Sequence, residues 1–590
     1  MSVVTKIKAA TAQAINTLYN VAILPTEVLV NDTKPEFEGD YTVVLFSFIK
    51  QLKQSPEKLG NDIGDYLVEN HPTLISGFNI IKGFLNLSIT DIFWKDFLYT
   101  QYNQPAFFQS LPDSHKVMIE YASPNTNKPL HLGHLRNIFL GWSMSEIYKA
   151  TGNQVVKTCI ANDRGIHICK SMVCWQLFGN GATPESTGLK GDHFVGDYYV
   201  MFGNELKKQV AELTENGMSK DLAEKEAPIM KLAQKMLQDW EAGVPEVMEL
   251  WRMMNSWVYS GFDVTYKRIG CDFDKVYYES ETYILGKQLV EIGLQKGVFY
   301  KKDDGSVWID LTNDGLDEKI VQRNDGTAVY ITQDIGLAVN KYDEFKCDNS
   351  IYVVGDEQNY HFKVLKLICQ KLELPSAEGI YHLSYGMVEL PTGRMKTREG
   401  TVVDADDIVD EMVNVARKKT EELGKVQDFE PGELLELYDT IGIGALKFFL
   451  LRVDPKRRMI FNPEDSIDFH GFTAPFIQFT HARIKSILRR QQPQNLPLVT
   501  DLLPLEKALI KLIEQYPNLL QEAAADHDPS KVAIYCYNLA KTFSSFYTEH
   551  SITNAESDEK MELRLQLGMF TASVIKNGMN LLGINVPERM

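Results

Sequence analysis

The feature that most constrains the fold is an alternation of strand-like and helical segments that begins at residue 116. The segment KVMIEYAS (116–123) has the pattern of a buried strand, and HLRNIFLGWSMSEIYKATG (134–152) has a helical periodicity that closes on Gly152. NQVVKTCIA (153–161) is again strand-like, and RGIHICKSMVCWQLFG (164–179) is again helical. Such alternation implies parallel strands joined by crossover helices. We therefore predict an α/β domain with a doubly wound parallel sheet.

Patterns on either side of this region indicate further domains. Residues 1–112 mix helical pieces with strand-like segments and predict a small α+β domain that ends in the turn-rich QPAFFQSLPDSHK. The α/β domain then covers 113–455 and is interrupted at about 198–265 by a charged, helix-periodic insertion. Within it SVWIDL, TAVYIT, SIYVVG and IYHLSYGMVEL predict more strands.

The last part of the chain changes character. Strand signals vanish from about residue 406 onward, so we predict that residues 456–590 form an all-helical domain. One turn-rich break, at 489–504, divides it.

Size and composition exclude several classes of protein. With 590 residues the chain is too long for one hydrophobic core, and its 44% hydrophobic and 24% charged residues are typical of globular proteins. No run of ~18 or more apolar residues occurs, so we expect no membrane span. The N-terminus lacks the apolar block of a secretory signal. Its periodic Val4, Ile7, Ile15 and Leu18 favour an ordinary packed helix over a transit peptide.

The charge of the chain bears on its partners. A formal net charge of −18 argues against non-specific binding to nucleic acid, and we expect no DNA partner. Local basic clusters exist, although each alone is equally typical of a solvated helix face. They comprise Lys456, Arg457, Arg458, Arg483, Lys485, Arg489 and Arg490.

The cysteines suggest a reducing compartment and no metal centre. Seven are scattered along the chain, without the paired spacing of a disulfide framework. The closest group, HICKSMVC, contains His167, Cys169 and Cys174, but no second pair exists to complete a zinc site. We therefore interpret these residues as ordinary side chains.

The stretch SPNTNKPLHLGHLRN (123–137) places two histidines where the first strand passes into the first helix. In doubly wound folds ligands bind beyond the carboxyl ends of the strands, and helix N-termini attract phosphates. His131 and His134 share one face of the first turn, Gly133 allows a flat ring or phosphate to approach, and Lys128 adds a cation. A metal would need more ligands. We therefore predict a nucleotide site rather than a metal site or a buried core pair.

A second segment strengthens this interpretation. GRMKTREG (393–400) sets Arg394, Lys396 and Arg398 between two glycines. Alone it is typical of an exposed turn, but with the histidine pair it predicts a loop that closes over a polyphosphate. The chain has no G-x-x-x-x-G-K-[ST] loop, so a P-loop enzyme is excluded.

These two segments resemble the HIGH and KMSKS signatures of class I aminoacyl-tRNA synthetases. Other stretches are similar to one family among them, the arginyl-tRNA synthetases, and they span essentially the whole chain. They are IEYASPNTNKPLHLGHLRN, DGTAVYITQDIG, YVVGDEQNYHF, FTAPFIQFTHARIKSI, LLGINVPERM and the N-terminal PEFEGDYTV, which resembles that family's extra amino-terminal domain.

The resemblance implies an activity. The enzyme would use ATP, with Mg²⁺, to convert L-arginine to arginyl-adenylate, and would transfer the arginyl group to the 2′-hydroxyl of the terminal adenosine of arginine tRNA. Family members need bound tRNA before activation. The resemblance also implies a cytoplasmic monomer whose N-terminal domain holds the outer corner of the tRNA.

Five residues would line the arginine pocket by this resemblance: Glu120, Asn125, Tyr330, Asp334 and Gln358. A guanidinium is a planar fork of donors that carboxylates meet well, so Glu120 and Asp334 suit this substrate. Taken without the resemblance, both acids are equally typical of solvated positions.

The same resemblance assigns roles in catalysis. His131, Gly133, His134 and Met395 would bind ATP, and the two histidines would stabilise the α-phosphate during activation. The basic loop departs from KMSKS, because Thr397 stands where its second lysine would be. Lys128 is placed to substitute for that lysine. Lys396 stands where the first serine of KMSKS would be, so which of the loop residues Arg394, Lys396 and Arg398 is the principal cation is left open, with Arg394 and Arg398 as candidates.

NDRGIHICK also departs from the family pattern Gly-Asp-Trp-Gly-x-Gln. Asp163 and Gly165 match it, whereas Arg164 and His167 do not. We leave open whether His167 is packed in the fold or contacts a substrate.

The helical last third would read the anticodon, since proteins recognise single-stranded loops by stacking bases on aromatic side chains. Phe476, Phe479 and Tyr547 match the family aromatics, and Arg483 would contact a phosphate. Aromatics at helical spacing are more often core residues.

Other functions stay open at this stage. They are another class I synthetase, such as one for cysteine or glutamine; a small-molecule nucleotidyltransferase, which would not need residues 456–590; and an inactive tRNA-binding paralogue. Intact Lys128, His131, His134 and Asp334 argue against the last of these.

Overall fold

A computed structural model describes residues 2–389, 391, 403–422, 424 and 429–590. Its centre is a five-stranded, wholly parallel sheet in the order β12-β11-β5-β6-β7. The strands are β5 (Lys116–Glu120), β6 (Gln154–Ala161), β7 (Lys275–Tyr278), β11 (Asn349–Gly355) and β12 (Ile380–Tyr385). The prediction of a doubly wound parallel sheet is confirmed.

The order of the strands fixes where a ligand would bind. From β5 the chain builds outward to β6 and β7 and later returns to place β11 on the other side of β5. The crevice beyond the carboxyl ends of β5 and β11 is therefore the topological switch point. The helices between the strands of this domain include α5 (Leu132–Ala150), α6 (Ile166–Phe178), α12 (Glu279–Thr282), α13 (Lys287–Gln295), α14 (Tyr330–Phe345) and α15 (Asn359–Lys371).

One predicted strand is wrong. In TAVYIT, Ala328 makes only an isolated bridge to Gln322, and α14 begins at Tyr330. Ile331 and Ile335 are both buried, four residues apart, so helical packing prevails over the strand propensity of the segment. The small antiparallel sheet here consists instead of β8 (Tyr300–Lys301), β9 (Val307–Ile309) and β10 (Lys319–Gln322).

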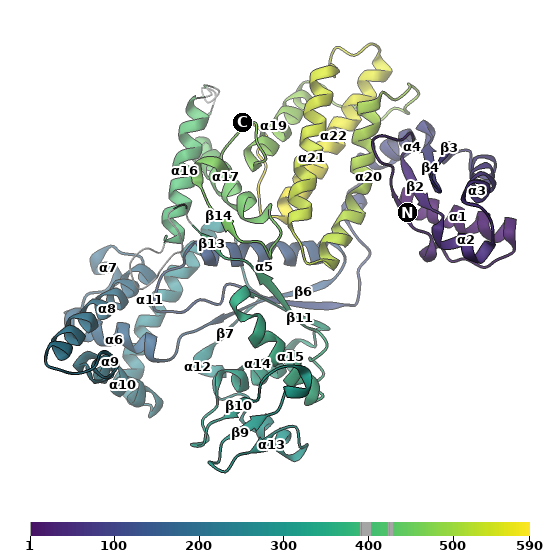
Figure 1. Cartoon of the computed structure of the whole chain (residues 1–590). Coiled ribbons are helices and arrows are strands. Elements are labelled where there is room, and N and C mark those ends of the chain that lie inside the picture. Colours follow the sequence, from purple (N-terminus) through teal and green to yellow (C-terminus); the bar gives the residue numbers. More distant parts are fainter. Residues whose placement is uncertain (1, 390, 392–402, 423, 425–428) are drawn as a thin grey trace.

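The helical insertion is confirmed and lies between α6 and β7. It starts with α7 (Pro184–Thr187) and α8 (Gly191–Glu215), continues through α9 (Lys220–Glu226) and α10 (Pro228–Glu241), and ends with α11 (Pro245–Ile269). Figure 1 shows these helices gathered on one side of the molecule, away from the N-terminal domain.

The N-terminal part folds around a four-stranded antiparallel sheet of order β1-β2-β4-β3. The predicted first helix is confirmed as α1 (Val3–Tyr19), and it buries Ile7 and Ile15, whereas Leu18 is exposed. The other elements are β1 (Val30–Asp32), β2 (Tyr41–Val44), α2 (Phe46–Leu52), α3 (Pro56–Asn70), β3 (Ile75–Ile81), β4 (Phe84–Ile89) and α4 (Asp91–Gln101).

The last part is helical, as predicted, except for one short strand. β14 (Met459–Ile460) pairs in parallel with β13 (Val388–Glu389), and a two-residue strand is too short to leave a periodic signal. The helices are α16 (Ala405–Glu422), α17 (Pro431–Leu451), α18 (Pro463–Ser466), α19 (Ala474–Arg490), α20 (Pro504–Ala525), α21 (Ser530–Glu549) and α22 (Asp558–Leu581). The turn-rich break separates α19 from α20.

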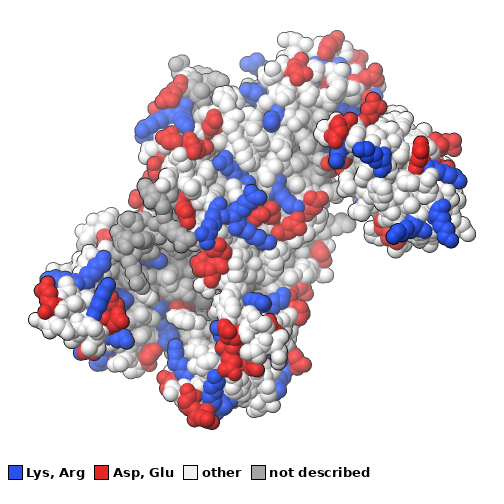
Figure 2. Space-filling model, in the orientation of Figure 1, with Lys and Arg blue, Asp and Glu red and all other residues white. Residues whose placement is uncertain are grey.

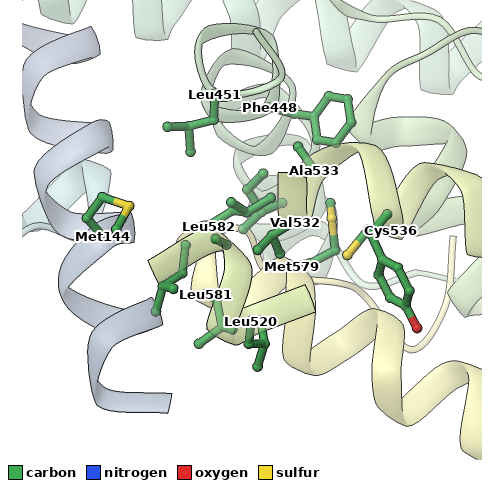
Figure 3. Close-up of a cluster of buried hydrophobic side chains, with 14 of the residues drawn as sticks. Met144, Phe448, Leu451, Leu520, Val532, Ala533, Cys536, Met579, Leu581 and Leu582 are labelled. Carbon is green, nitrogen blue, oxygen red and sulfur yellow. The ribbon is translucent and has the colours of Figure 1, made fainter. Parts of the chain in front are cut away.

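Helix α5 joins the sheet to this helical part. Met144 of α5 lies in one hydrophobic cluster with Leu451 of α17, Leu520 of α20 and Leu581 of α22 (Figure 3). All four side chains are buried, so α5 packs on the helical domain around Met144. The N-terminus of the same helix carries the histidine pair.

Candidate active site

The histidine pair forms the start of α5. His131 is the N-cap residue, and its Nδ1 accepts a hydrogen bond from the backbone N–H of Gly133 at 3.1 Å. The backbone N–H of His131 in turn donates to Nδ1 of His134, also at 3.1 Å. This reciprocal arrangement is a capping box made with two imidazoles. The rings lie with their centroids 3.9 Å apart.

These hydrogen bonds fix the tautomers of both rings. A ring nitrogen that accepts a backbone N–H carries no proton, so a neutral imidazole must hold its proton on Nε2. Both Nδ1 atoms accept in this way, and both rings therefore have an Nε2–H donor to offer. Two neutral donors at a helix N-terminus suit the oxygens of a phosphate.

The surroundings keep these rings neutral. Burial, with a contribution from Lys128, lowers the pKa of His131 to about 4. Burial and the neighbouring His131 lower the pKa of His134 well below its ordinary value. Burial also lowers the pKa of Lys128. The predicted residues Lys128, His131, Gly133 and His134 therefore lie together as a dense group of donors.

Glu120 has a partner that the sequence did not reveal. It ends β5, is 8% exposed, and forms an ion pair with Lys341 of α14. The Lys341 ammonium also lies 4.9 Å from the centre of the Tyr352 ring and 5.5 Å from that of Tyr277. The Glu120 carboxylate is thus paired with a buried ammonium that also contacts two tyrosine rings.

The other residues expected to bind arginine are more open. Asp334 of α14 contacts Nε2 of His361 at 2.7 Å, and its side chain is 40% exposed. Tyr330 is 75% exposed at the start of the same helix. Gln358 is exposed and lies in a 3-10 turn after β11. Asn125 is exposed and bridges Asn162.

Glu279 adds a carboxyl group to this region that sequence reasoning missed. It opens α12 directly after β7, and burial raises its pKa to about 7. Arg164 opposes this shift, whereas Asp163 and Asp334 contribute to it. Glu120 and Asp334 both act on the pKa of buried Tyr352. The acidic groups therefore surround one region, beyond the carboxyl ends of β5 and β7 and beside α14.

Asp163, which matches the family pattern, and Arg164 and His167, which depart from it, all have structural partners. The carboxylate of Asp163 accepts hydrogen bonds from Tyr259 and from both the backbone and the hydroxyl of Ser280, all at 2.8–2.9 Å. Arg164 lies 3.8 Å above the Tyr283 ring and pairs with Glu241. His167 is exposed, and its Nδ1 lies 3.1 Å from the Tyr199 hydroxyl.

The basic loop predicted to close over ATP, with Arg394, Met395, Lys396 and Arg398, lies outside the described residues. The segment that follows it is described, and it meets the histidine pair directly. Leu132 N–H donates to Val403 O at 3.2 Å, and Ala405 N–H donates to Leu130 O at 3.0 Å. His131 and Asp404 therefore face each other across a short antiparallel bridge.

Three of the four residues expected at the anticodon lie together. Arg483 of α19 has its guanidinium 4.7 Å from the centre of the Phe479 ring and 5.2 Å from that of Tyr547. Tyr547 is 38% exposed. Phe476 is separate, since its ring packs 5.5 Å from that of Tyr537. The first three residues can present an aromatic and cationic surface, whereas Phe476 has the position of a partly buried packing residue.

Potential metal ligands gather at one further place in the described part of the chain. His193, Asp404 and Asp406 offer ligand atoms within 4.8 Å of one another. Lys190 already lies among them, with its ammonium 2.7 Å from Asp406, so the group is an ion-pair network.

No helix among the described residues has the length and apolar character needed to cross a membrane.

Comparisons with known proteins identify the family. Residues 100–462 match the family model described as tRNA synthetases class I (R), catalytic domain. Residues 5–89 match the arginyl tRNA synthetase N terminal domain, and 477–590 match the DALR anticodon binding domain.

Relatives match over their full length. The arginine–tRNA ligase of Parabacteroides distasonis is 51% identical over 99% of each chain, and that of Flavobacterium psychrophilum is 52% identical over 98% of each. The solved structure of Thermus thermophilus arginyl-tRNA synthetase is 23% identical, covers 99% of both chains and superposes with a TM-score of 0.82, which supports the fold. The chain belongs to the arginyl-tRNA synthetase family.

Proposed function

We propose that this chain is an arginine–tRNA ligase. It activates L-arginine with ATP and transfers the arginyl group to the 2′-hydroxyl of the terminal adenosine of arginine tRNA. The observation that carries the proposal is that hydrogen-bond donors for a phosphate and acidic groups for a cation both lie at the switch point of the parallel sheet. Neutral Nε2–H donors of His131 and His134 suit a polyphosphate, and the acidic groups around Glu120 suit a cationic amino acid.

In the first step, a carboxylate oxygen of arginine attacks the α-phosphorus of ATP, and pyrophosphate leaves. Negative charge grows on the α-phosphate oxygens in the transition state, where the Nε2–H groups of His131 and His134 and the ammonium of Lys128 would stabilise it. Mg²⁺ would accompany the ATP as part of the substrate. In the second step the 2′-hydroxyl attacks the activated carbonyl, and AMP leaves.

The arginine side chain would occupy the acidic region. Among the described residues, neither Asp334 nor Glu279 has a lysine or arginine within ion-pair distance, whereas Glu120 is already paired with Lys341. We therefore assign the guanidinium to Asp334 and Glu279, and the α-amino group to the neighbourhood of Glu120 and Asn125. Tyr330 and Gln358 would complete the pocket at its exposed side.

The tRNA would lie across several parts of the chain. Although the net charge is −18, Lys and Arg side chains gather in the centre of the face shown in Figure 2, over the region where β14 and α5 lie in Figure 1. Residues 1–112 would hold the outer corner of the tRNA, 113–455 its acceptor end, and 456–590 its anticodon, on Phe479, Arg483 and Tyr547. We further propose a cytoplasmic monomer, which seven free thiols suit.

The deciding experiment is exchange of labelled pyrophosphate into ATP, with and without arginine tRNA, using each amino acid in turn. Exchange with arginine alone, in the presence of the tRNA, supports the proposal. Exchange with cysteine or glutamine would indicate a different class I synthetase. Exchange that persists after removal of residues 456–590, without any tRNA, would favour a small-molecule nucleotidyltransferase. A complete lack of exchange would indicate an inactive tRNA-binding paralogue.

A further inference from the structure

His193 lies in the helical insertion, far in sequence from both signature segments, yet its helix rests on the first of them. Helix α8 begins at Gly191, and a Cβ placed on Gly196 would lie 2.8 Å from the ring of Pro129 and 3.6 Å from the Cα of Lys128. Glycine at 196 therefore allows α8 to touch the backbone that leads into His131.

The imidazole of His193 holds the segment that follows the basic loop. Its Nε2 lies 2.8 Å from the carboxylate of Asp404. The other carboxylate oxygen of Asp404 accepts the backbone N–H groups of Asp406 and Asp407 at the start of α16. Asp404 thus has two tasks: its carboxylate caps a helix and binds His193 at the same time.

The backbone on either side of Asp404 forms hydrogen bonds with the residues that flank His131. Val403 O accepts from Leu132 N–H, and Ala405 N–H donates to Leu130 O, so one hydrogen bond lies on each side of His131. The Asp404 carboxylate is also close enough to act on the pKa of His131. A shift of Asp404 would therefore move the backbone of His131 and change the electrostatic field at the His131 imidazole.

The charges around His193 favour its cationic form. Asp192 and Asp197 face it from its own helix, and Asp404, Asp406 and Asp407 face it from the segment that opens α16; Lys190, at the N-cap of α8, opposes their effect. The hydrogen bond to Asp404 raises the pKa of His193. Lys190 pairs with Asp192 and Asp406, and Thr265 of α11 joins the same network. The insertion is thereby tied to the start of α16 by several ionic contacts.

We propose that His193 is a positioning residue for adenylate formation: it holds Asp404 and, through the two backbone hydrogen bonds that flank His131, keeps that imidazole aimed at the α-phosphate. This inference rests on the proposed function. It assigns to the helical insertion a part in the chemistry of the first signature, beyond its structural connection of α6 to β7.

The test compares His193→Phe, which keeps a planar ring but removes the donor, with His193→Gln, which keeps a donor. In pyrophosphate exchange we expect kcat of His193→Phe to fall about tenfold or more, because a hydrogen bond to a carboxylate is lost. The KM for arginine should stay within about twofold, since its proposed pocket lies on other elements. His193→Gln should recover most of kcat.

Asp404→Asn preserves the helix cap while it removes the charge. If His193 acts through Asp404, the double variant His193→Phe/Asp404→Asn should be no slower than His193→Phe alone. Lys235→Gln is the matched control, because it removes an exposed ion pair with Asp239 from the same insertion and should leave kcat unchanged.

Hydrogen–deuterium exchange tests, without any assay of activity, whether His193 stabilises the two backbone hydrogen bonds that flank His131. In His193→Phe, peptides that contain the amides of Leu132 and Ala405 should exchange about tenfold faster than in the parent chain, whereas those of β11 should not change. Unchanged exchange rates in these peptides would overturn the inference. Faster deuterium exchange in His193→Phe with an unaltered kcat would also overturn it, because the contact would then be structural only. If the parent chain itself shows no arginine-dependent exchange of pyrophosphate, the proposed function fails, and the deuterium comparison still decides whether His193 holds the segment.

Discussion

The backbone N–H of His131 donates to Nδ1 of His134, and this one hydrogen bond determines which nitrogen of His134 can act on a substrate. Because Nδ1 is occupied, Nε2 carries the proton and is the only ring donor. The structural role of His134 therefore depends on Nδ1 and its catalytic role on Nε2. Substitution by asparagine or glutamine, whose amide groups reach different positions, can test the two roles separately.

His134→Asn places an oxygen near the position of Nδ1 and can still accept from His131 N–H, but it has no group at the position of Nε2. His134→Gln places an amide nitrogen near Nε2. We expect His134→Asn to lower kcat of pyrophosphate exchange about 10²- to 10³-fold, the usual cost of one lost donor to developing charge, and His134→Gln to lower it less. Equal losses in both variants, with unchanged melting temperatures, would contradict the assignment of the donor to Nε2.

Lys341 is expected to be essential for stability because it neutralises Glu120 inside the catalytic domain. Both side chains are at most 10% exposed. Lys341→Met would leave a buried carboxylate without a partner, and we expect the free energy of unfolding to fall by about 3–5 kcal/mol. Chemical denaturation of the full chain measures this change.

Two further variants separate this effect from a general loss of charge. Lys341→Met combined with Glu120→Gln should regain much of the lost stability, since the orphaned charge is gone. At the C-cap of the same helix, Lys346→Met breaks the exposed pair with Asp343 and the contact of the ammonium with the Tyr342 ring, and should leave the denaturation midpoint nearly unchanged. A single Lys341→Met variant as stable as the parent would mean that Glu120 is protonated or solvated.

These two sites show how far sequence reasoning reaches. The histidine pair, its glycine and its place after the first strand were predictable, because they depend on residues within one short stretch and on the topology of parallel sheets. Lys341, Glu279 and Asp404 were not singled out, because each reaches its partners only through the tertiary fold. Lys341 is 221 residues from Glu120 in sequence, and nothing local in α14 marks it as a buried cation.

The same reasoning explains the errors in the fold. TAVYIT has residues that favour a strand, but burial of Ile331 and Ile335 on one helix face decided the outcome. β14 arises only because β13 lies beside it. Segments with a clear periodic or apolar pattern were therefore predicted correctly, whereas TAVYIT and β14, whose structure is decided by tertiary packing, were not.

Arg483 should contribute to tRNA binding through charge, and Tyr547 through stacking. Arg483→Gln is expected to weaken binding and to reduce the slope of log K against log salt by roughly 0.7, the value for one contact with a single-stranded phosphate. Tyr547→Ala is expected to weaken binding by about 1–3 kcal/mol with the slope unchanged. Titrations of labelled arginine tRNA at several salt concentrations measure both quantities. An acceptor-stem minihelix without an anticodon is the control, and its affinity should not change in either variant.

Lys447 should give the stability of the chain a distinctive dependence on pH. Lys447 is 5% exposed, and its ammonium donates to Gly583 O at 2.6 Å and lies 5.5 Å from the centre of the Phe139 ring. Burial lowers the pKa of Lys447 to about 8, whereas an unfolded chain would hold this proton up to a pKa of about 10.4. Between these values the unfolded state binds more protons than the folded state.

Stability contributed by Lys447 therefore rises with pH in this window, and below about pH 8 the full cost of burying its charge remains. Other buried groups titrate at high pH as well, so the informative quantity is the difference between the parent chain and Lys447→Met. We expect the free energy of unfolding of the parent, relative to Lys447→Met, to increase by about 2 kcal/mol from pH 7.5 to 9.5. Replacement of the exposed Lys541 by Met should give a difference that does not vary with pH. A flat difference for Lys447→Met as well would mean that water or a counter-charge reaches the Lys447 ammonium in the folded chain.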